Sequence, residues 1–236
     1  MSHTSQRRGL DPSRPGKELV VLAMIPTEHK DAAGITEAMS ELAVKMLQYG
    51  PDNWASRNAT EIDIPQLNDA MKFARGLNVS PEKTAEMLIS AVGGASSVIT
   101  AVYTDPKKVE GLIKDLKGDW LARNKAKGYP ISIVLSGLFN DVHECCRKTG
   151  LTEHTYLHSL GFFGRVENLP SEDELSLITM CGHGLIAVNR VRHLVKSIRD
   201  GAMTPKEAAN DIAKPCVCGI VNRQRAEEIF RRLAAG

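Results

Sequence analysis

Aromatic side chains are scarce in this chain of 236 residues, making up only 5% of it. Few side chains are therefore available to stack on bases or sugars. Neither sign of charge dominates, because 30 Lys and Arg residues stand against 28 Asp and Glu residues, a formal net charge of +2. A general electrostatic field that attracts nucleic acid or an anionic membrane is not expected from this balance. We therefore expect neither as a partner.

Long hydrophobic runs are also missing. The longest one near the start, Leu19–Ile25, is far shorter than the roughly 20 residues of a membrane-spanning helix. Residues 1–16 are polar and rich in Ser, Arg, Pro and Gly, unlike a secretory signal, and we expect a disordered tail there. The five cysteines are odd in number and lack the spacing of a secreted disulfide scaffold. These features predict a cytoplasmic protein whose cysteines are thiols or metal ligands.

Residues 17–95 have mainly helical patterns. Asp31–Tyr49 carries apolar residues at the 3.6-residue spacing of an amphipathic helix and ends at Gly50-Pro51. A shorter helix is predicted for residues 64–76. A third begins at Ser80-Pro81, a capping residue followed by proline at the first helical position, and ends by Gly93-Gly94.

Residues 96–236 combine strands with helices. Short β-branched runs at 97–103 and 131–135 predict two buried strands, each followed by a helix, and 155–163 is a candidate third strand. From Ser171 onward the chain is predicted to be helical, with a capping box at Thr204–Glu207 and a last helix capped by Asn222. The predicted fold class is α/β or α+β and helix-rich, with a small sheet flanked by helices and a C-terminal helical cap that carries the cysteines. We expect it to form one compact unit with residues 17–95.

Three cysteines stand in two glycine-containing segments of this cap. Cys181 lies in Met180–Gly184, and Cys216 and Cys218 lie in Lys214–Gly219. Both segments are predicted to lie near helix N-termini, where free N–H groups lower a thiol's pKa and make it a better ligand or nucleophile. Gly182, Gly184 and Gly219 have no Cβ, so the backbone there is expected to approach a bulky cofactor closely.

Three thiolates suit soft metals and iron–sulfur clusters. The Cys-x-Cys spacing differs from the Cys-x-x-Cys common in zinc sites, which favours a [4Fe-4S] cluster with metal ligands Cys181, Cys216 and Cys218 and one open iron site. The predicted function is that of a lyase, a hydratase or a sulfur-transfer enzyme acting on a small-molecule substrate. His183 and His158 are the acid/base candidates.

Two alternatives remain open at this stage. With His183 as a fourth ligand the same cysteines predict a Cys₃His zinc site. Such a site, or a cluster, could belong to a non-enzymatic structural or sensor module that acts on a redox partner protein.

The second alternative rests on a resemblance. Met180-Cys181-Gly182-His183-Gly184 resembles the motif around one catalytic cysteine of the proline racemase and related epimerase families. The resemblance implies a metal-independent racemase or epimerase in which a thiol at a helix start works opposite a second cysteine. The second motif of those families is rich in Gly and Thr, whereas Cys218-Gly219-Ile220-Val221 lacks the Thr and the further Gly.

The remaining candidates give weaker patterns. His143, Cys145 and Cys146 share one predicted helix but are too close in sequence to face the same way, so we expect one buried cysteine and no joint ligand site. His154 and His158 share one face of the candidate strand. If a pocket opens beside the cysteines, His158 and Arg165, with Tyr156 and Ser159, are expected to form its polar wall.

Overall fold

The computed structural model describes residues 8–13, 18–56, 73–74, 76–91, 97–153, 155, 161–216 and 218–236. His154, His158 and nearly all of the predicted helix at 64–76 lie outside this set. Of the candidate strand at 155–163, residues 161–163 are described and form no strand.

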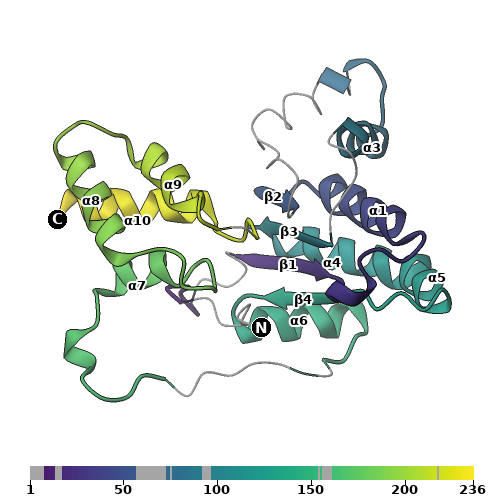
Figure 1. Cartoon of the computed structure of the whole chain (residues 1–236), viewed down its shortest axis with the longest axis horizontal. Coiled ribbons are helices and arrows are strands. Elements are labelled where there is room, and N and C mark those ends of the chain that lie inside the picture. The colour runs from purple at the N-terminus through teal and green to yellow at the C-terminus, as the bar shows by residue number, and fades with distance from the viewer. Residues whose placement is uncertain are drawn as a thin grey trace.

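Four antiparallel strands form a single sheet at the centre of the molecule (Figure 1). They are β1 (Leu19–Met24), β2 (Asn53–Ser56), β3 (Val98–Tyr103) and β4 (Ser132–Ser136), in the spatial order β2-β3-β1-β4. Val21 of β1 faces Ala101 of β3 on one side and Leu135 of β4 on the other. Because every pairing is antiparallel, the fold is α+β, which confirms the helix-rich class with a small sheet. The order of the described strands is that of the split βαβ arrangement.

Two of these strands lie in the segment for which helices were predicted. β1 is an uninterrupted apolar run because both of its faces are covered, so it lacks the alternation that marks a half-buried strand. β2 is only four residues long. The sheet therefore joins residues 19–56 to residues 98–136, and no domain boundary separates the two halves of the chain near residue 95.

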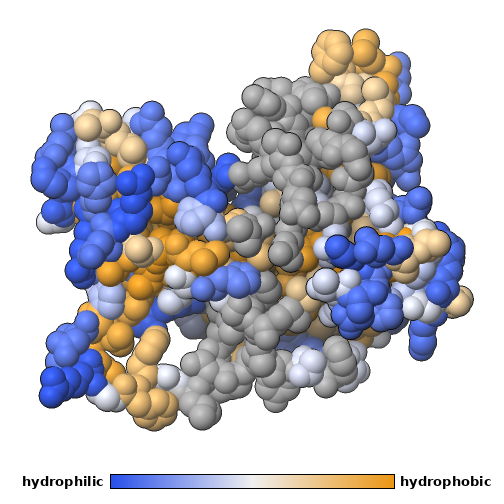
Figure 2. All heavy atoms as spheres, viewed as in Figure 1, coloured by the Kyte–Doolittle hydropathy of each residue, from blue (hydrophilic) through white to orange (hydrophobic). Residues whose placement is uncertain are grey.

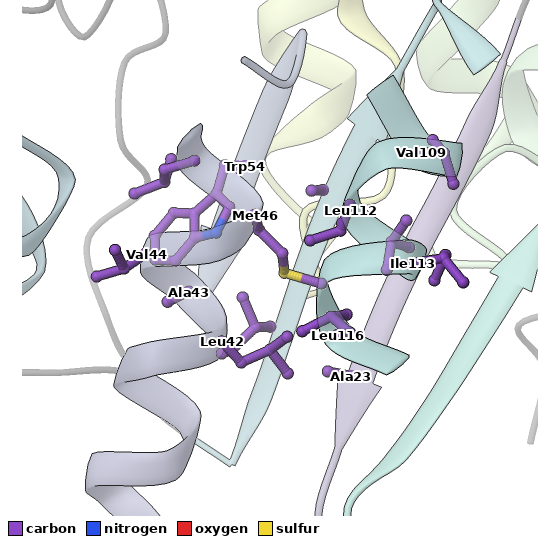
Figure 3. Close-up of a cluster of buried hydrophobic side chains, with 14 of the residues drawn as sticks. Ala23, Leu42, Ala43, Val44, Met46, Trp54, Val109, Leu112, Ile113 and Leu116 are labelled. Atoms are coloured by element: carbon purple, nitrogen blue, oxygen red, sulfur yellow. The ribbon is translucent and has the colours of Figure 1, made fainter. Parts of the chain in front are cut away.

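One face of the sheet is covered by helices from the first two thirds of the chain. These are α1 (Ile35–Gln48), α4 (Pro106–Asp115) and α6 (Phe139–Thr149), with α3 (Pro81–Ala91) packed on α1. A π-helical turn (Leu116–Trp120) and α5 (Leu121–Ala126) extend α4. Side chains of α1 and α4, such as Leu42 and Leu112, meet Trp54 and Ala23 of the strands in a buried core (Figure 3).

The opposite face carries the predicted C-terminal helical cap. It consists of α7 (Glu172–Ile178), α8 (Val188–Arg199), α9 (Pro205–Ala213) and α10 (Arg223–Ala235). Successive side chains of a strand point to opposite faces, and accordingly Val21 belongs to the first core whereas Val20 and Val102 belong to a second core formed with the cap. Three cap helices, α7, α9 and α10, begin where the sequence predicts, because α7 and α9 both have complete capping boxes and Asn222 caps α10.

Part of the expected disordered tail contacts this cap. The Arg8 side chain bonds to Glu172 of α7 and lies over the Phe162 ring, while the Arg8 carbonyl accepts a hydrogen bond from Arg225 of α10. A Cβ added to Gly9 would overlap the Ser176 hydroxyl. Arg8 and Gly9 therefore both lie against the cap helices.

Several large hydrophobic side chains are exposed. Phe73, Leu77 and Met87 lie in and just before α3, where Figure 2 shows hydrophobic atoms at one edge of the molecule, and Phe162 and Phe163 precede a short 3-10 turn at Val166–Asn168. Among the described helices, none has both the length and the hydrophobicity needed to cross a bilayer.

Candidate cysteine site

The two cysteine segments lie together in the second core. Cys181 follows the end of α7, whereas Cys216 and Cys218 lie in the turn between α9 and α10, which reaches the sheet beside β2 and β3 (Figure 1). All three side chains are buried, with 0%, 7% and 8% exposure respectively. No disulfide joins any of the five cysteines.

Two backbone N–H groups donate to the Cys181 sulfur. They belong to His183 and Leu185, at 3.4 and 3.3 Å from Sγ. Gly182 and Gly184 both have positive φ, 71° and 68°, a conformation that costs other residues about 1–2 kcal/mol. These two glycines allow the loop to curl around its own sulfur, so that both N–H groups point inward.

Cys216 accepts hydrogen bonds from three backbone N–H groups, those of Cys218, Ile220 and Val221. Burial raises the pKa of the Cys216 thiol, the N–H groups act in the opposite direction, and the nearby Cys181 raises it further. Burial is the largest of these effects, so the pKa lies above its usual value.

Cys218 lies beside His183. The imidazole Nε2 is 4.0 Å from the Cys218 sulfur, while Nδ1 lies 3.2 Å from the Cys181 carbonyl oxygen. A proton on Nδ1, donated to that carbonyl, leaves the lone pair of Nε2 directed toward the Cys218 sulfur. His183 is itself exposed, so its ring connects the buried sulfurs with solvent.

The Cys-x-Cys turn is held against the sheet. The amide of Asn53 in β2 donates to the Gly219 carbonyl at 2.8 Å, and the hydroxyl of Thr100 in β3 donates to the Cys218 carbonyl. Gly219 has a φ of +66°, and a Cβ at this position would overlap the Cβ of Ala55. Its missing side chain thus permits close packing on β2.

The N–H donors also differ in origin from the prediction. Cys181 comes after α7 and seven residues before the start of α8, and Cys216 lies directly beyond α9. The groups that bond to these sulfurs belong to the loops themselves. The predicted stabilisation by helix N-termini is therefore replaced by local backbone donors.

Cys145 and Cys146 provide an internal comparison. Both are buried in α6, where one buried cysteine was expected. Burial raises the pKa of Cys145 to about 12 and that of Cys146 to about 11. No backbone N–H donor is among the causes of either shift, which is the behaviour of cysteines that pack as small hydrophobic side chains.

The side chains are not arranged as a preformed metal site. Among the described residues, no three His, Cys, Asp or Glu side chains converge as they would around an ion. Cys181, His183, Cys216 and Cys218 are all described, whereas His158, the other acid/base candidate, lies outside the described residues. Arg165 is exposed in the loop before α7.

Asn53 and Thr100 were missed by the sequence analysis. Both are buried polar residues, 6% and 0% exposed, that contact the Cys-x-Cys turn from the sheet. Thr100 did leave a signal, because it is a polar residue inside the apolar run Val98–Tyr103 and a buried hydroxyl needs a hydrogen-bond partner.

Comparison with known proteins adds no assignment, since no family model, no curated protein and no solved structure matches this chain.

Proposed function

We propose that this protein binds a [4Fe-4S] cluster through the thiolates of Cys181, Cys216 and Cys218. The observation that supports the proposal is the number of backbone N–H groups directed at buried sulfur, two at Cys181 and three at Cys216. A neutral thiol is a weak acceptor and makes little use of such donors, whereas a thiolate gains from each of them.

The comparison within the chain strengthens this argument. Cys145 and Cys146 are as well buried as the three site cysteines, but they stand in a helix whose N–H groups bond to backbone carbonyls. Among the described contacts, it is Cys181 and Cys216 whose sulfurs have backbone donors suited to a charged sulfur. Hydrogen bonds to cluster sulfurs are one of the means by which proteins set the potential of an iron–sulfur centre.

The residues fit such a group in their chemistry, and they require side-chain movement to bind it. The soft donors and the N–H groups are in place, but the sulfurs do not yet surround an ion. Metal sites rarely exist fully formed without their metal, and binding displaces the thiol protons. Each cysteine has only one side-chain torsion to change before its sulfur can move toward a shared centre.

A cluster held by three cysteines has one iron without a protein thiolate, and it would supply Lewis-acid chemistry to a small substrate in elimination, hydration or sulfur transfer. The residue placed to move a proton there is His183. Its imidazole is exposed on one side, and its Nε2 lies 4.0 Å from the Cys218 sulfur. The Cys181 carbonyl fixes the orientation of the ring through Nδ1.

Zinc is the second candidate, and the position of His183 favours it. In a tetrahedral site with Zn–S near 2.3 Å and Zn–N near 2.05 Å, the two ligand atoms lie about 3.6 Å apart. The Nε2–Sγ separation of 4.0 Å is close to this value. A carbonyl partner on the other ring nitrogen is the usual support of a metal-bound histidine.

The decisive experiment compares all five cysteines. The protein is purified without oxygen, and its absorbance spectrum, iron, sulfide and zinc are measured in Cys→Ala variants at each position. We expect a brown protein with about four irons per chain, with colour and iron lost on replacing Cys181, Cys216 or Cys218 and retained in the Cys145 and Cys146 controls. A colourless protein with one zinc would overturn the cluster and support the second candidate, and a metal-free protein would overturn both.

His183→Gln separates a catalytic from a ligating role. If His183 moves protons, the variant keeps its iron, and addition of a small carboxylate still changes the electron paramagnetic resonance spectrum of the reduced cluster. If His183 is a ligand, the variant loses metal in the same preparation. A cluster that is unaffected by every small ligand tested would contradict the open iron site and favour a redox or sensor module.

A further inference from the structure

The sheet holds two successive carbonyl groups of the Cys-x-Cys turn. Thr100 binds the carbonyl of Cys218, and Asn53 binds the carbonyl of Gly219. These two polar side chains come from neighbouring strands, β3 and β2, and both are buried. Strand residues at this depth are usually apolar, so two polar ones facing the same turn require an explanation.

Peptide geometry connects these carbonyls to the sulfur. In a trans peptide the C=O and the N–H point in opposite directions. The Gly219 carbonyl and the Ile220 N–H belong to one peptide unit. Because Asn53 holds this carbonyl toward the sheet, the Ile220 N–H of the same unit is directed away from the sheet, and it is one of the three donors to Cys216.

The preceding peptide obeys the same rule. Thr100 holds the Cys218 carbonyl, and the N–H on the other side of that unit, which belongs to Gly219, donates to the Cys216 carbonyl at 3.0 Å. Thr100 thereby closes the turn, and Asn53 directs the next N–H at the sulfur. The absence of a Cβ on Gly219 lets the turn approach Ala55 and the Thr100 hydroxyl.

We propose that Asn53 is a positioning residue, which orients the Gly219–Ile220 peptide so that the Ile220 N–H donates to the sulfur of Cys216, with Thr100 fixing the peptide before it. Any effect of Asn53 on a bound cluster rests on the proposed function above. The orientation of the Ile220 amide does not rest on it, because that orientation is a property of the metal-free turn.

The test uses amide hydrogen exchange of the whole chain in its metal-free, reduced form. A hydrogen bond to a neutral thiol is weak, and loss of about 0.5 kcal/mol corresponds to roughly twofold faster exchange. In Asn53→Ala we therefore expect the Ile220 amide to exchange about twofold faster, while the amides of α1 and α4 are unchanged. Asn124→Ala is the matched control, since Asn124 is also buried and its amide also donates to a carbonyl, that of Trp120, at 2.8 Å.

Thr100 supplies a second pair of variants that preserve the shape of the side chain. Thr100→Val removes the hydroxyl and should speed exchange at Gly219, whereas Thr100→Ser retains it and should restore the slow rate. If Asn53→Ala does not fold, the unmodified protein still tests the proposal, because an Asn53 side-chain amide that exchanges as fast as an exposed one would overturn it.

The reduction potential of the bound cluster provides a second measurement. In anaerobically reconstituted protein, Asn53→Ala should lower the midpoint potential of the cluster, because N–H donors stabilise the more negative reduced state, and Asn124→Ala should leave it unchanged. Equal effects of the two variants on exchange and potential would overturn the positioning role. A chain that binds no iron but shows the Ile220 effect would overturn the cluster and still support the role of Asn53.

Discussion

Gly219→Ala tests how closely the cysteine turn is packed on the sheet. The new Cβ would overlap that of Ala55 and would lie 3.3 Å from the Thr100 hydroxyl oxygen. Overpacking of this kind typically costs about 1–3 kcal/mol. The positive φ of 66° adds about 1–2 kcal/mol for a residue that has a Cβ. We therefore expect the free energy of unfolding to fall by about 2–5 kcal/mol.

Gly184→Ala separates the two contributions. Gly184 has nearly the same φ, 68°, but no atom of the described residues lies within 4 Å of the position of its added Cβ. It should lose only the conformational part, about 1–2 kcal/mol. The difference between the two variants then measures the packing of the turn against β2.

A double-mutant cycle with Ala55→Gly makes the test specific. Removing the Ala55 Cβ should weaken the strand by about 0.5–1 kcal/mol, but it should recover most of the packing loss when combined with Gly219→Ala. Urea unfolding of the reduced, metal-free chain, followed by tryptophan fluorescence, measures these differences, because Trp54 and Trp120 are both fully buried. Additive effects in the cycle, or equal losses for Gly219→Ala and Gly184→Ala, would refute the reasoning.

Three further outcomes are expected from the same unfolding assay. Burial raises the Cys145 pKa from 9.0 to about 12, so between these pH values the folded chain keeps the thiol proton that the unfolded chain loses. The free energy of unfolding should therefore fall from pH 9 towards about 12, and it should fall less steeply in Cys145→Ala. An equally steep fall in both proteins would contradict this origin. Arg225→Met removes the guanidinium whose Nε lies 2.9 Å from the Glu18 carboxylate, which is 0% exposed, and should cost about 3–5 kcal/mol. An unchanged midpoint would show that the pair is dispensable. Thr204→Ala removes the cap of α9 and should cost about 1 kcal/mol, whereas the exposed Lys206→Ala should change little.

Local signals explain why most helices were predicted correctly. The start of α7 is determined by Ser171 and Glu174, which bond to each other's backbone, and α1 ends just before Gly50, whose φ is +60°. Both features depend on residues within a few positions of each other. A sequence pattern contains that information in full.

Strand pairing does not follow from local patterns. β1 pairs with β3 and β4, which are more than 70 and 100 residues away in the sequence, and it is buried by helices on both faces. Its continuous apolar run is compatible with a buried helix or a buried strand, and only the partners decide between them. β2 was missed because it owes its conformation to pairing with β3 and to the burial of Trp54.

At the candidate site, too, local residue patterns were predictable and long-range contacts were not. Residue types and glycine neighbours indicated Cys181, Cys216 and Cys218 as candidates. The direction of each N–H group was not predictable, since it depends on the positive φ of Gly182 and Gly184 and on Asn53, which is separated from Gly219 by 166 positions. The contact between His183 and Cys218 likewise joins two loops that are 35 residues apart.

The position of the cysteines inside the second core couples their ionisation to the fold. A charged sulfur is costly in an apolar interior unless it is bonded, so the backbone donors of the two loops are needed most when the thiols lose their protons. Those donors exist only while the turn is held on β2 and β3 and the Cys181 loop is curled. A metal that binds the thiolates therefore binds the packed arrangement of cap and sheet more tightly than the separated one. By linkage it stabilises that packing, and the cap helices should become more resistant to exchange when the site is loaded.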